Sequence, residues 1–209
     1  MSASVEQALF IAGPVGRLEA IWSPSESNAG TVAVICHPHP LQGGAMTNKV
    51  VTTLARTWRD KGVATLRFNF RGTGNSEGVH DQGVGEIDDV LAVLEWLTAE
   101  RGMKTLDLAG FSFGAWVSAA ASVCLPESVH LRHLVLVAPP VQYEGFGAVQ
   151  PPAGTLVLQG EVDEVVEPQS VYAWVASRAR VPELLRFPET GHFFHGRLGA
   201  LKAELAARI

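Results

Sequence analysis

The sequence has little cysteine, little net charge and no long hydrophobic run. Its only two cysteines, Cys36 and Cys124, both lie in apolar segments, so we expect two buried free thiols in a reducing compartment and no disulfide framework. The net charge of −5 lacks the basic excess that nucleic-acid binding requires. No apolar run is long enough to span a bilayer, so we expect no membrane span.

The beginning of the chain also lacks a targeting signal. MSASVEQALF contains no basic patch, no apolar stretch and no cleavage site of a signal peptide. The composition, with 47% hydrophobic and 18% charged residues, is that of a globular domain and not of a disordered chain. No repeat or linker divides the sequence. We therefore predict one domain over residues 1–209 in a cytoplasmic protein that is a monomer or a homodimer.

Short apolar runs alternate with helical patterns along the chain. Nearly continuous apolar runs are typical of parallel strands covered on both faces, and they occupy residues 31–37, 63–70, 105–111, 131–139, 154–160 and 181–189. Helical patterns occupy residues 47–60, 85–100, 115–123, 168–179 and 197–208. QALFIAG and GRLEAIWS predict an antiparallel hairpin at one sheet edge. This alternation predicts an α/β fold with ligands at the carboxyl ends of the strands.

The segment GFSFG, residues 110–114, has the form G-x-S-x-G and stands between a predicted strand and a predicted small-residue helix. A serine on such a turn is held in a strained backbone conformation that exposes its hydroxyl group. The alternative is that Ser112 is an ordinary helix N-cap. A reactive serine needs a base to take its proton, and the base needs an acid to orient it.

Candidate acids follow the strand 154–160. Three carboxylates lie in the segment GEVDE, and Glu161, Asp163 and Glu164 all remain candidates on spacing alone. A group at the carboxyl end of this strand would lie at the same sheet edge as Ser112.

Candidate bases follow the next predicted strand, in the segment TGHFFH. His192 directly follows a glycine in the loop after the strand. His195 lies three residues further on, near the beginning of the last predicted helix. We therefore prefer His192.

The segment HPHPLQGG, residues 37–44, directly follows another strand, where an oxyanion hole requires a main-chain amide directed at the nucleophile. Proline has no amide hydrogen, so either His39 or Leu41 would supply this donor. The amide of Phe113, next to Ser112, would supply the other.

Two further patterns are ambiguous, and we reject a ligand for both. A metal site would combine four histidines, which are His37, His39, His192 and His195. These histidines lack the accompanying carboxylate or cysteine ligands at the spacing of known metal sites. RGTGNSEG (71–78) resembles a dinucleotide loop, but its third glycine comes one residue late and no helix begins before about residue 85. We expect an ordered loop in which Arg71 forms an ion pair with Asp88 or Asp89, and no cofactor.

Taken together, these motifs resemble the α/β-hydrolase superfamily over essentially the whole chain. The matching parts are the Ser112 turn, the G-x-x-D that ends at Asp163, the pair Gly191-His192 and the loop FNFRGTGNSEG. The chain order of serine, acid and histidine is also that of this superfamily. HPHPLQGGAMTNKVV looks like a small bacterial subfamily of predicted hydrolases that carries an HPHP…GG…NK segment after the third strand.

The resemblance implies an α/β-hydrolase fold with an eight-stranded, mostly parallel sheet and helices on both faces. It also implies a triad of Ser112, His192 and Asp163, which favours Asp163 over the neighbouring glutamates. Superfamily members often insert a lid after the sixth strand, but the stretch between Val137 and Gly154 is too short for one. We expect no separate lid domain and an open cleft.

We therefore predict a serine hydrolase that cleaves carboxylic ester or thioester bonds in small to medium acyl substrates. The apolar residues that we expect to line an acyl pocket are Phe111, Met46, Tyr143, Phe146 and Phe193. One alternative is a protein of the same fold that binds a small ligand without turnover, which an ester panel would identify. Another is a lactone or C–C bond hydrolase with the same triad, which differs in pocket shape and not in catalytic residues.

Overall fold

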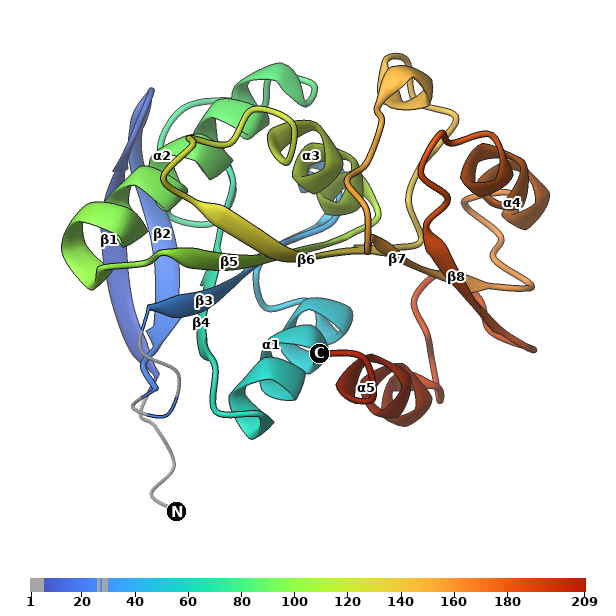
Figure 1. Ribbon diagram of the computed structural model, residues 1–209. Helices are drawn as coiled ribbons and strands as arrows, with labels where there is room; N and C mark the ends of the chain where they lie inside the picture. Colours follow the sequence, from blue (N-terminus) through green and yellow to red (C-terminus); the bar gives the residue numbers. More distant parts are fainter. Residues whose placement is uncertain (1–5, 26, 28–29) are drawn as a thin grey trace.

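The computed structural model describes residues 6–25, 27 and 30–209, which form one eight-stranded sheet with helices on both of its faces (Figure 1). The strand order is β1-β2-β4-β3-β5-β6-β7-β8. β1 is antiparallel to β2, β2 is antiparallel to β4, and the other pairs are parallel. The predicted fold class, sheet size and edge hairpin are confirmed.

The elements follow the predicted runs to within a few residues. The strands are β1 (Gln7–Gly13), β2 (Gly16–Ser23), β3 (Thr31–Cys36), β4 (Ala64–Phe68), β5 (Thr105–Phe111), β6 (His130–Val137), β7 (Leu156–Gly160) and β8 (Glu183–Phe187). The α-helices are α1 (Lys49–Asp60), α2 (Val84–Arg101), α3 (Phe113–Ala121), α4 (Pro168–Ala176) and α5 (Leu198–Ala206). Two short 3₁₀ helices are η1 (Pro40–Gln42) and η2 (Phe146–Ala148).

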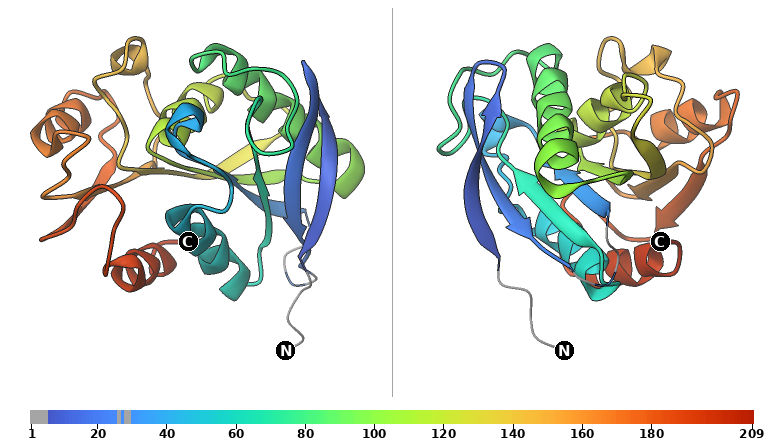
Figure 2. Two further views of the ribbon diagram at one scale, coloured as in Figure 1. Left: turned by 180° about the vertical axis from the view of Figure 1, so that it is seen from behind. Right: turned by 60° about the vertical axis from the view of Figure 1, so that its left-hand side comes forward.

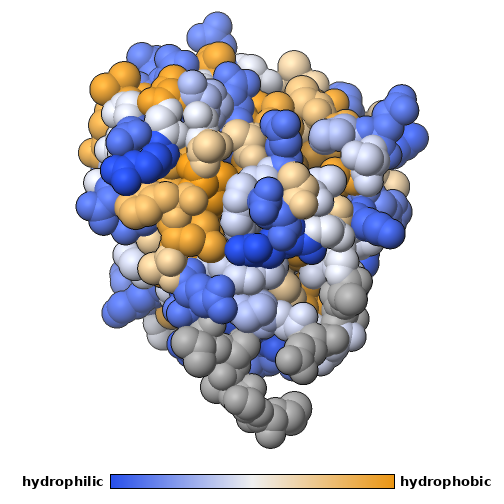
Figure 3. Space-filling view, turned by 90° about the vertical axis from the view of Figure 1, so that its left-hand side faces the viewer, coloured by the Kyte–Doolittle hydropathy of each residue, from blue (hydrophilic) through white to orange (hydrophobic). Residues whose placement is uncertain are grey.

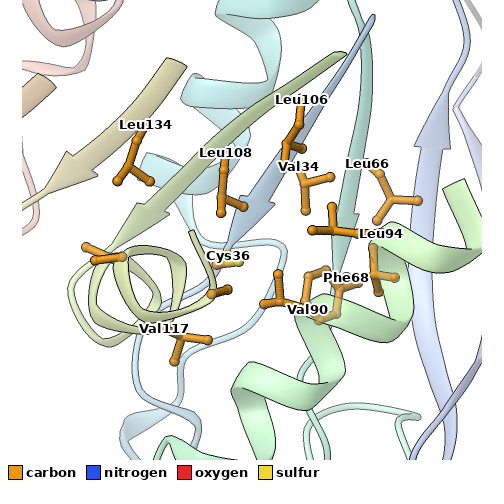
Figure 4. Packing of buried hydrophobic residues seen from close by; sticks show 14 of the residues in the cluster. Val34, Cys36, Leu66, Phe68, Val90, Leu94, Leu106, Leu108, Val117 and Leu134 are labelled. Carbon is orange, nitrogen blue, oxygen red and sulfur yellow. The ribbon is translucent and has the colours of Figure 1, made fainter. Parts of the chain in front are cut away.

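The helices form two layers, with α2, α3 and α4 on one face of the sheet and α1 and α5 on the other (Figures 1 and 2). Each layer has its own hydrophobic cluster against the sheet. Figure 4 shows the larger cluster, where Val90 and Leu94 of α2 and Val117 of α3 lie over apolar side chains of the central strands. The predicted apolar helix faces therefore pack onto both faces of the sheet, which removes a large apolar area from water.

The carboxyl ends of the parallel strands meet at one edge of the sheet. The loops that leave β3, β5, β7 and β8 there contain the HPHPLQGG segment, Ser112, Asp163 and His192 respectively. The parallel direction of these strands thus brings four loops that are far apart in the sequence to the same end of the sheet.

The hairpin of β1 and β2 forms one lateral edge of the sheet, and Figure 3 shows hydrophobic areas among hydrophilic ones on this side of the molecule. Phe10 on β1 and Val15 in the turn are both about half exposed. The guanidinium carbon of Arg17 lies 4.7 Å from the centre of the Phe10 ring, which covers part of this apolar surface.

One prediction about the cysteines is wrong. Cys36 on β3 is buried, as expected, but Cys124 is exposed. α3 ends at Ala121, so Cys124 lies in the turn beyond the helix, where the apolar pattern no longer faces the sheet.

No helix in the described part of the chain is long and apolar enough to cross a membrane. The expectation that the chain begins without a signal peptide rests partly on residues 1–5, which lie outside the described residues.

Candidate active site

Ser112 stands on a tight turn between β5 and α3. Its backbone has φ 54° and ψ −121°, a conformation that residues other than glycine rarely adopt. Both neighbouring glycines are needed for close packing. A Cβ on Gly110 would lie 2.1 Å from the Gly114 carbonyl oxygen, and one on Gly114 would lie 2.5 Å from the carbonyl oxygens of Cys36 and His37. Ser112 occupies the N-cap position, but its side chain makes no capping hydrogen bond, so the hydroxyl group is free to bond elsewhere.

The structure brings the three predicted residues into one hydrogen-bonded chain. Nε2 of His192 lies 3.0 Å from Oγ of Ser112. Nδ1 of the same ring lies 2.9 Å from Oδ2 of Asp163 and 3.1 Å from Oδ1. A ring that donates from Nδ1 to a carboxylate has an unprotonated Nε2 when neutral, so it can accept the serine proton.

Asp163 is nearly buried and is held by several donors. The amides of Val165 and Val166 donate to its Oδ1 at 2.9 and 2.8 Å, and Nε2 of Gln159 donates to Oδ2 at 3.0 Å. Burial by itself would raise the pKa of Asp163, but the hydrogen bonds from His192 and these amides outweigh it and place the pKa below its ordinary value. The carboxylate is therefore ionised at neutral pH.

The other two candidate acids have different contacts. Glu161 forms an ion pair with Arg186, with a distance of 2.7 Å between Oε1 and Nη2. Oε2 of Glu164 accepts the main-chain amide of His192 at 3.1 Å. A Cβ on Gly191 would lie 2.7 Å from the same oxygen, so glycine there lets the histidine loop approach Glu164 closely. The sequence offered Glu164 only as a rival acid and did not predict that it holds the histidine loop.

His195 lies away from this chain of hydrogen bonds. Its side chain is exposed, and its ring lies 5.8 Å from the ring of Phe193. Of the two histidines, His192 is the one whose ring lies within hydrogen-bonding distance of Ser112.

The HPHPLQGG loop is fixed at its first residue by two main-chain contacts. Nδ1 of His37 lies 2.6 Å from the Pro38 carbonyl oxygen, and the amide of Phe70 donates to Nε2 at 3.0 Å. Burial lowers the pKa of His37 to about 4, although the contact with Pro38 opposes this shift. The ring is therefore neutral at pH 7, and with both nitrogens occupied it cannot bind a metal.

The same loop distinguishes the two candidate oxyanion amides. Leu41 donates its amide hydrogen to Nδ1 of His39 at 3.2 Å, so this donor is already used. Among the residues that the structure describes, no protein acceptor is found for the amide of His39 or for that of Phe113. These two amides are the donors that remain available in the two loops beside Ser112.

The loop of residues 71–78 is ordered and does not open a helix, since α2 begins only at Val84. Arg71 pairs with Asp89 and not with Asp88: its Nη2 lies 2.8 Å from Oδ1 of Asp89. Glu19 on β2 accepts hydrogen bonds from the amide and side chain of Asn75 at 3.0 and 2.8 Å. This loop is thus held by its own side chains and by the edge hairpin.

The predicted pocket residues divide into two groups. Phe111 and Phe146 have no exposed surface, and Met46 is nearly buried. Phe146 packs against Trp174 of α4, with 5.0 Å between ring centres. The prediction that Phe111, Met46 and Phe146 line an open pocket is therefore wrong, because these side chains are used by the core. Tyr143 is partly exposed and Phe193 is 41% exposed, so both can contact a ligand.

Two residues near the Ser112 turn were not predicted from the sequence. The ring of His80 lies 5.4 Å from the ring of Phe113 and 4.9 Å from that of His39. Nδ1 of His80 lies 2.7 Å from Oε1 of the buried Glu86, a close contact that does not meet the geometry of a hydrogen bond. This cluster forms because the loop of residues 71–83 packs against the HPHPLQGG loop, and the sequence gives no sign of that contact.

Within residues 6–25, 27 and 30–209, no group of three or more His, Cys, Asp or Glu side chains is arranged to hold a metal ion.

Comparison with known proteins places this geometry in context. Residues 17–145 match the family model described as X-Pro dipeptidyl-peptidase (S15 family). The chain is 44% identical to an α/β serine hydrolase without a lid from Xanthomonas campestris, over 99% of this chain and 94% of that one, with a TM-score of 0.90. It is 43% identical to an α/β serine hydrolase homologue from Coxiella burnetii, over 97% of both chains, also with a TM-score of 0.90. An uncharacterized Rickettsia prowazekii protein is 37% identical over 169 residues, which are 78% of this chain and 69% of that protein.

Proposed function

We propose, from the premise that the chain belongs to the S15 family and to the α/β serine hydrolases without a lid, that it is a hydrolase of carboxylic esters or thioesters. The acyl groups would be small to medium in size, and the reaction would use Ser112, His192 and Asp163. The observation that carries the proposal is the continuous hydrogen-bonded chain from Oγ of Ser112 through the His192 ring to the Asp163 carboxylate. A hydroxyl group, a base and an ionised acid at these distances are the requirements for nucleophilic attack on a carbonyl carbon.

In the acylation step, Oγ of Ser112 attacks the carbonyl carbon of the substrate while its proton moves to Nε2 of His192. The C=O electron pair moves onto oxygen and gives a tetrahedral oxyanion. When this intermediate collapses, the bond to the leaving group breaks and His192 gives its proton to the departing alcohol or thiol. Asp163 stabilises the charged imidazole ring but does not take up the proton.

The oxyanion would accept hydrogen bonds from the amides of Phe113 and His39. The Phe113 amide lies at the close-packed junction of β5 and α3, and the His39 amide lies at a turn closed by hydrogen bonds, so both donors are oriented before the charge develops. This preorganisation is the source of electrostatic catalysis. The beginning of α3 lies at the same point, and the positive end of its dipole favours negative charge.

In the deacylation step, a water molecule gives one proton to Nε2 of His192 and attacks the acyl carbon. Collapse of the second oxyanion breaks the bond to Oγ, and His192 returns the proton to Ser112. The products are a carboxylic acid and the free enzyme.

The substrate class follows from the surroundings of Ser112. The partly exposed aromatic side chains of Tyr143, Trp116 and Phe193 offer apolar contacts to an acyl or alcohol group. Without a lid over the site, long lipid chains would remain largely in water, so short and medium acyl chains fit better.

The proposal is tested with a panel of p-nitrophenyl esters and acyl thioesters of increasing chain length. We expect hydrolysis with a maximum at short to medium chains, and its loss in Ser112→Ala. The matched control is Ser122→Ala, at the other end of α3, where the hydroxyl group donates to the Ala119 carbonyl oxygen at 2.7 Å. Equal activity of Ser112→Ala and wild type, or no turnover of any ester or thioester by the wild type, would contradict the proposal.

A dipeptidyl-peptidase activity is the second candidate, favoured by the match of residues 17–145 to the S15 family model. The same triad could attack the amide bond after proline. Release of p-nitroaniline from Xaa-Pro p-nitroanilides, lost in Ser112→Ala, would support this candidate. Ester hydrolysis without release from these amides would exclude it.

A further inference from the structure

The turn that contributes one oxyanion amide has little burial to hold it in place. Residues 41–43 are all exposed, and Leu41 has 75% of its surface in water. The loop is fixed before the turn by His37 and after it by the amide of Met46, which donates to Oδ1 of Asn69 at 2.8 Å. The position of the turn itself must come from its own hydrogen bonds.

One of these hydrogen bonds comes from a side chain. His39 is the N-cap residue of η1, and its Nδ1 accepts the Leu41 amide at 3.2 Å. The main-chain oxygen of His39 also accepts the amides of Gln42 and Gly44 at 3.1 and 3.0 Å. Side chain and main chain of the same residue thus close the turn from both sides, as an Asn or Ser does at the beginning of a helix.

The His39 ring is held from the opposite side by other rings. Its centre lies 5.0 Å from that of Phe113, the residue after the nucleophile, and 4.9 Å from that of His80. The His80 side chain is only 7% exposed and contacts Glu86, which is fully buried. Glu86 in turn accepts the amides of Asp81 and Gly83 at 2.9 and 2.7 Å. The beginning of α2 therefore supports the ring.

The hydrogen bond from Leu41 requires a neutral ring. An amide hydrogen can approach Nδ1 only if that nitrogen carries no proton, so the proton of the neutral ring is on Nε2. Burial and the neighbouring His80 lower the pKa of His39 below its ordinary value, while the negative charge of Glu86 acts in the opposite direction. The surroundings therefore favour the neutral form that the turn needs.

We propose that His39 is a positioning residue of the active site, whose neutral ring accepts the Leu41 amide and thereby fixes the turn that carries the oxyanion-binding amide of His39. The inference rests on the proposed function for its catalytic consequence, but the turn and its hydrogen bond can be tested without turnover. If the imidazole acts only as an acceptor for Leu41, another acceptor of similar reach can replace it.

Two substitutions separate the hydrogen bond from the packing. His39→Asn keeps a short acceptor for the Leu41 amide but removes the aromatic ring, whereas His39→Phe keeps a ring beside His80 and Phe113 but has no acceptor. We expect His39→Phe to lower kcat on the best ester about 100-fold with a nearly unchanged KM, since misplacing a reacting group by about 1 Å has this effect. His39→Asn should remain within a few-fold of the wild type. His195→Phe is the matched control on an exposed histidine and should change neither constant.

A readout without turnover is hydrogen exchange of the Leu41 amide, followed by NMR. We expect slow exchange in the wild type and in His39→Asn, and fast exchange in His39→Phe. Acidification should remove this protection in the wild type, because protonated Nδ1 cannot accept, but not in His39→Asn. Melting temperatures identify variants that fail to fold, and His39→Ala then replaces His39→Phe as the variant without an acceptor.

Two results would overturn the inference. If kcat of His39→Asn falls as far as that of His39→Phe, an acceptor for the Leu41 amide is not what the site needs from His39. If His39→Phe keeps both kcat and Leu41 protection, the hydrogen bond does not position the turn. Failure of the wild type to hydrolyse any substrate would refute the proposed function instead, and the exchange measurement would still decide whether His39 holds the turn.

Discussion

At the scale of single residues, the chemistry of this site depends on which nitrogen atoms are occupied. His37 has a main-chain acceptor at Nδ1 and a main-chain donor at Nε2, so it has no free position for a second proton. His192 instead has a carboxylate at Nδ1 and a hydroxyl group at Nε2, which is the arrangement of a base. The partners of the two rings therefore determine which nitrogen can accept a proton, and only His192 has one beside a hydroxyl group.

We expect His37 to make the stability of the protein depend on pH. The unfolded chain binds a proton on this histidine as the pH falls through about 6.5, whereas the folded protein resists protonation down to about pH 4. The unfolded state therefore binds more protons in this interval, so the free energy of unfolding should decrease as the pH falls, by up to about 3 kcal/mol.

Urea unfolding of wild type and His37→Gln at several pH values between 4 and 7 measures this effect. Glutamine can donate to Pro38 and accept from Phe70 but does not titrate, so its curve should be flatter by about the same amount. Parallel curves for the two proteins would show that His37 is not the group responsible.

Asp163 is expected to act through its charge. Asp163→Asn keeps the shape of the side chain but cannot hold the His192 ring in the same tautomer, so kcat should fall about 10³- to 10⁴-fold with little change in KM. Steady-state kinetics on the best ester measures this. Glu161→Gln is the control, because the Glu161 carboxylate pairs with Arg186. Loss of less than about tenfold in Asp163→Asn would refute the role of Asp163.

At the scale of elements, the position of Ser112 depends on how closely α3 approaches β3. Gly114 lies in the first turn of α3, and its Cα faces the carbonyl oxygens of Cys36 and His37 at the end of β3. Any Cβ there would have to displace the main chain, which cannot rotate away as a side chain can.

Gly114→Ala should therefore destabilise the protein by about 1–3 kcal/mol and reduce activity together with stability. Gly199→Ala is the matched control, since Gly199 also lies in the first turn of a helix and a Cβ there would meet nothing within 4 Å. The control should be neutral or slightly stabilising. Calorimetry measures both, and equal melting temperatures of the two variants would contradict this account of the turn.

The elements themselves could be predicted because each is encoded locally. Apolar runs of strand length and helical stripes determine the strands and helices, and parallel strand direction then places Ser112, Asp163 and His192 at one edge. The hydrogen bond from Leu41 to His39 could not be predicted, because it depends on loop conformation. The contacts of Glu164, and the pair of His80 and Glu86, depend on the packing of distant segments.

The pocket residues could not be predicted from the sequence either. A large apolar side chain near a strand end can face the core or the cleft, and sequence spacing alone does not distinguish the two. Phe146 faces the core because η2 turns it towards α4, whereas Phe193 is left exposed beside His192.

At the scale of the whole molecule, one sheet joins two hydrophobic clusters. The cluster under α2, α3 and α4 and the cluster under α1 and α5 use alternate side chains of the same strands, such as Val34 and Ile35 of β3. Neither cluster can lose its order without exposing the strands that support the other.

We therefore expect one cooperative unfolding transition, in agreement with the single domain predicted from the sequence. Far-ultraviolet circular dichroism reports the helices, and tryptophan fluorescence reports both clusters, because Trp58 belongs to one and Trp174 to the other. The two urea curves should coincide. Two separated transitions would mean that the clusters fold independently.

The central claim is that Ser112 is the nucleophile of a hydrolase, and its most direct test is the mass of the intact protein after reaction with a fluorophosphonate. We expect one phosphonyl group per chain, located on Ser112 by peptide mapping, and no adduct in Ser112→Ala under the same conditions. An unmodified wild-type protein, or an adduct of the same stoichiometry in Ser112→Ala, would contradict the account.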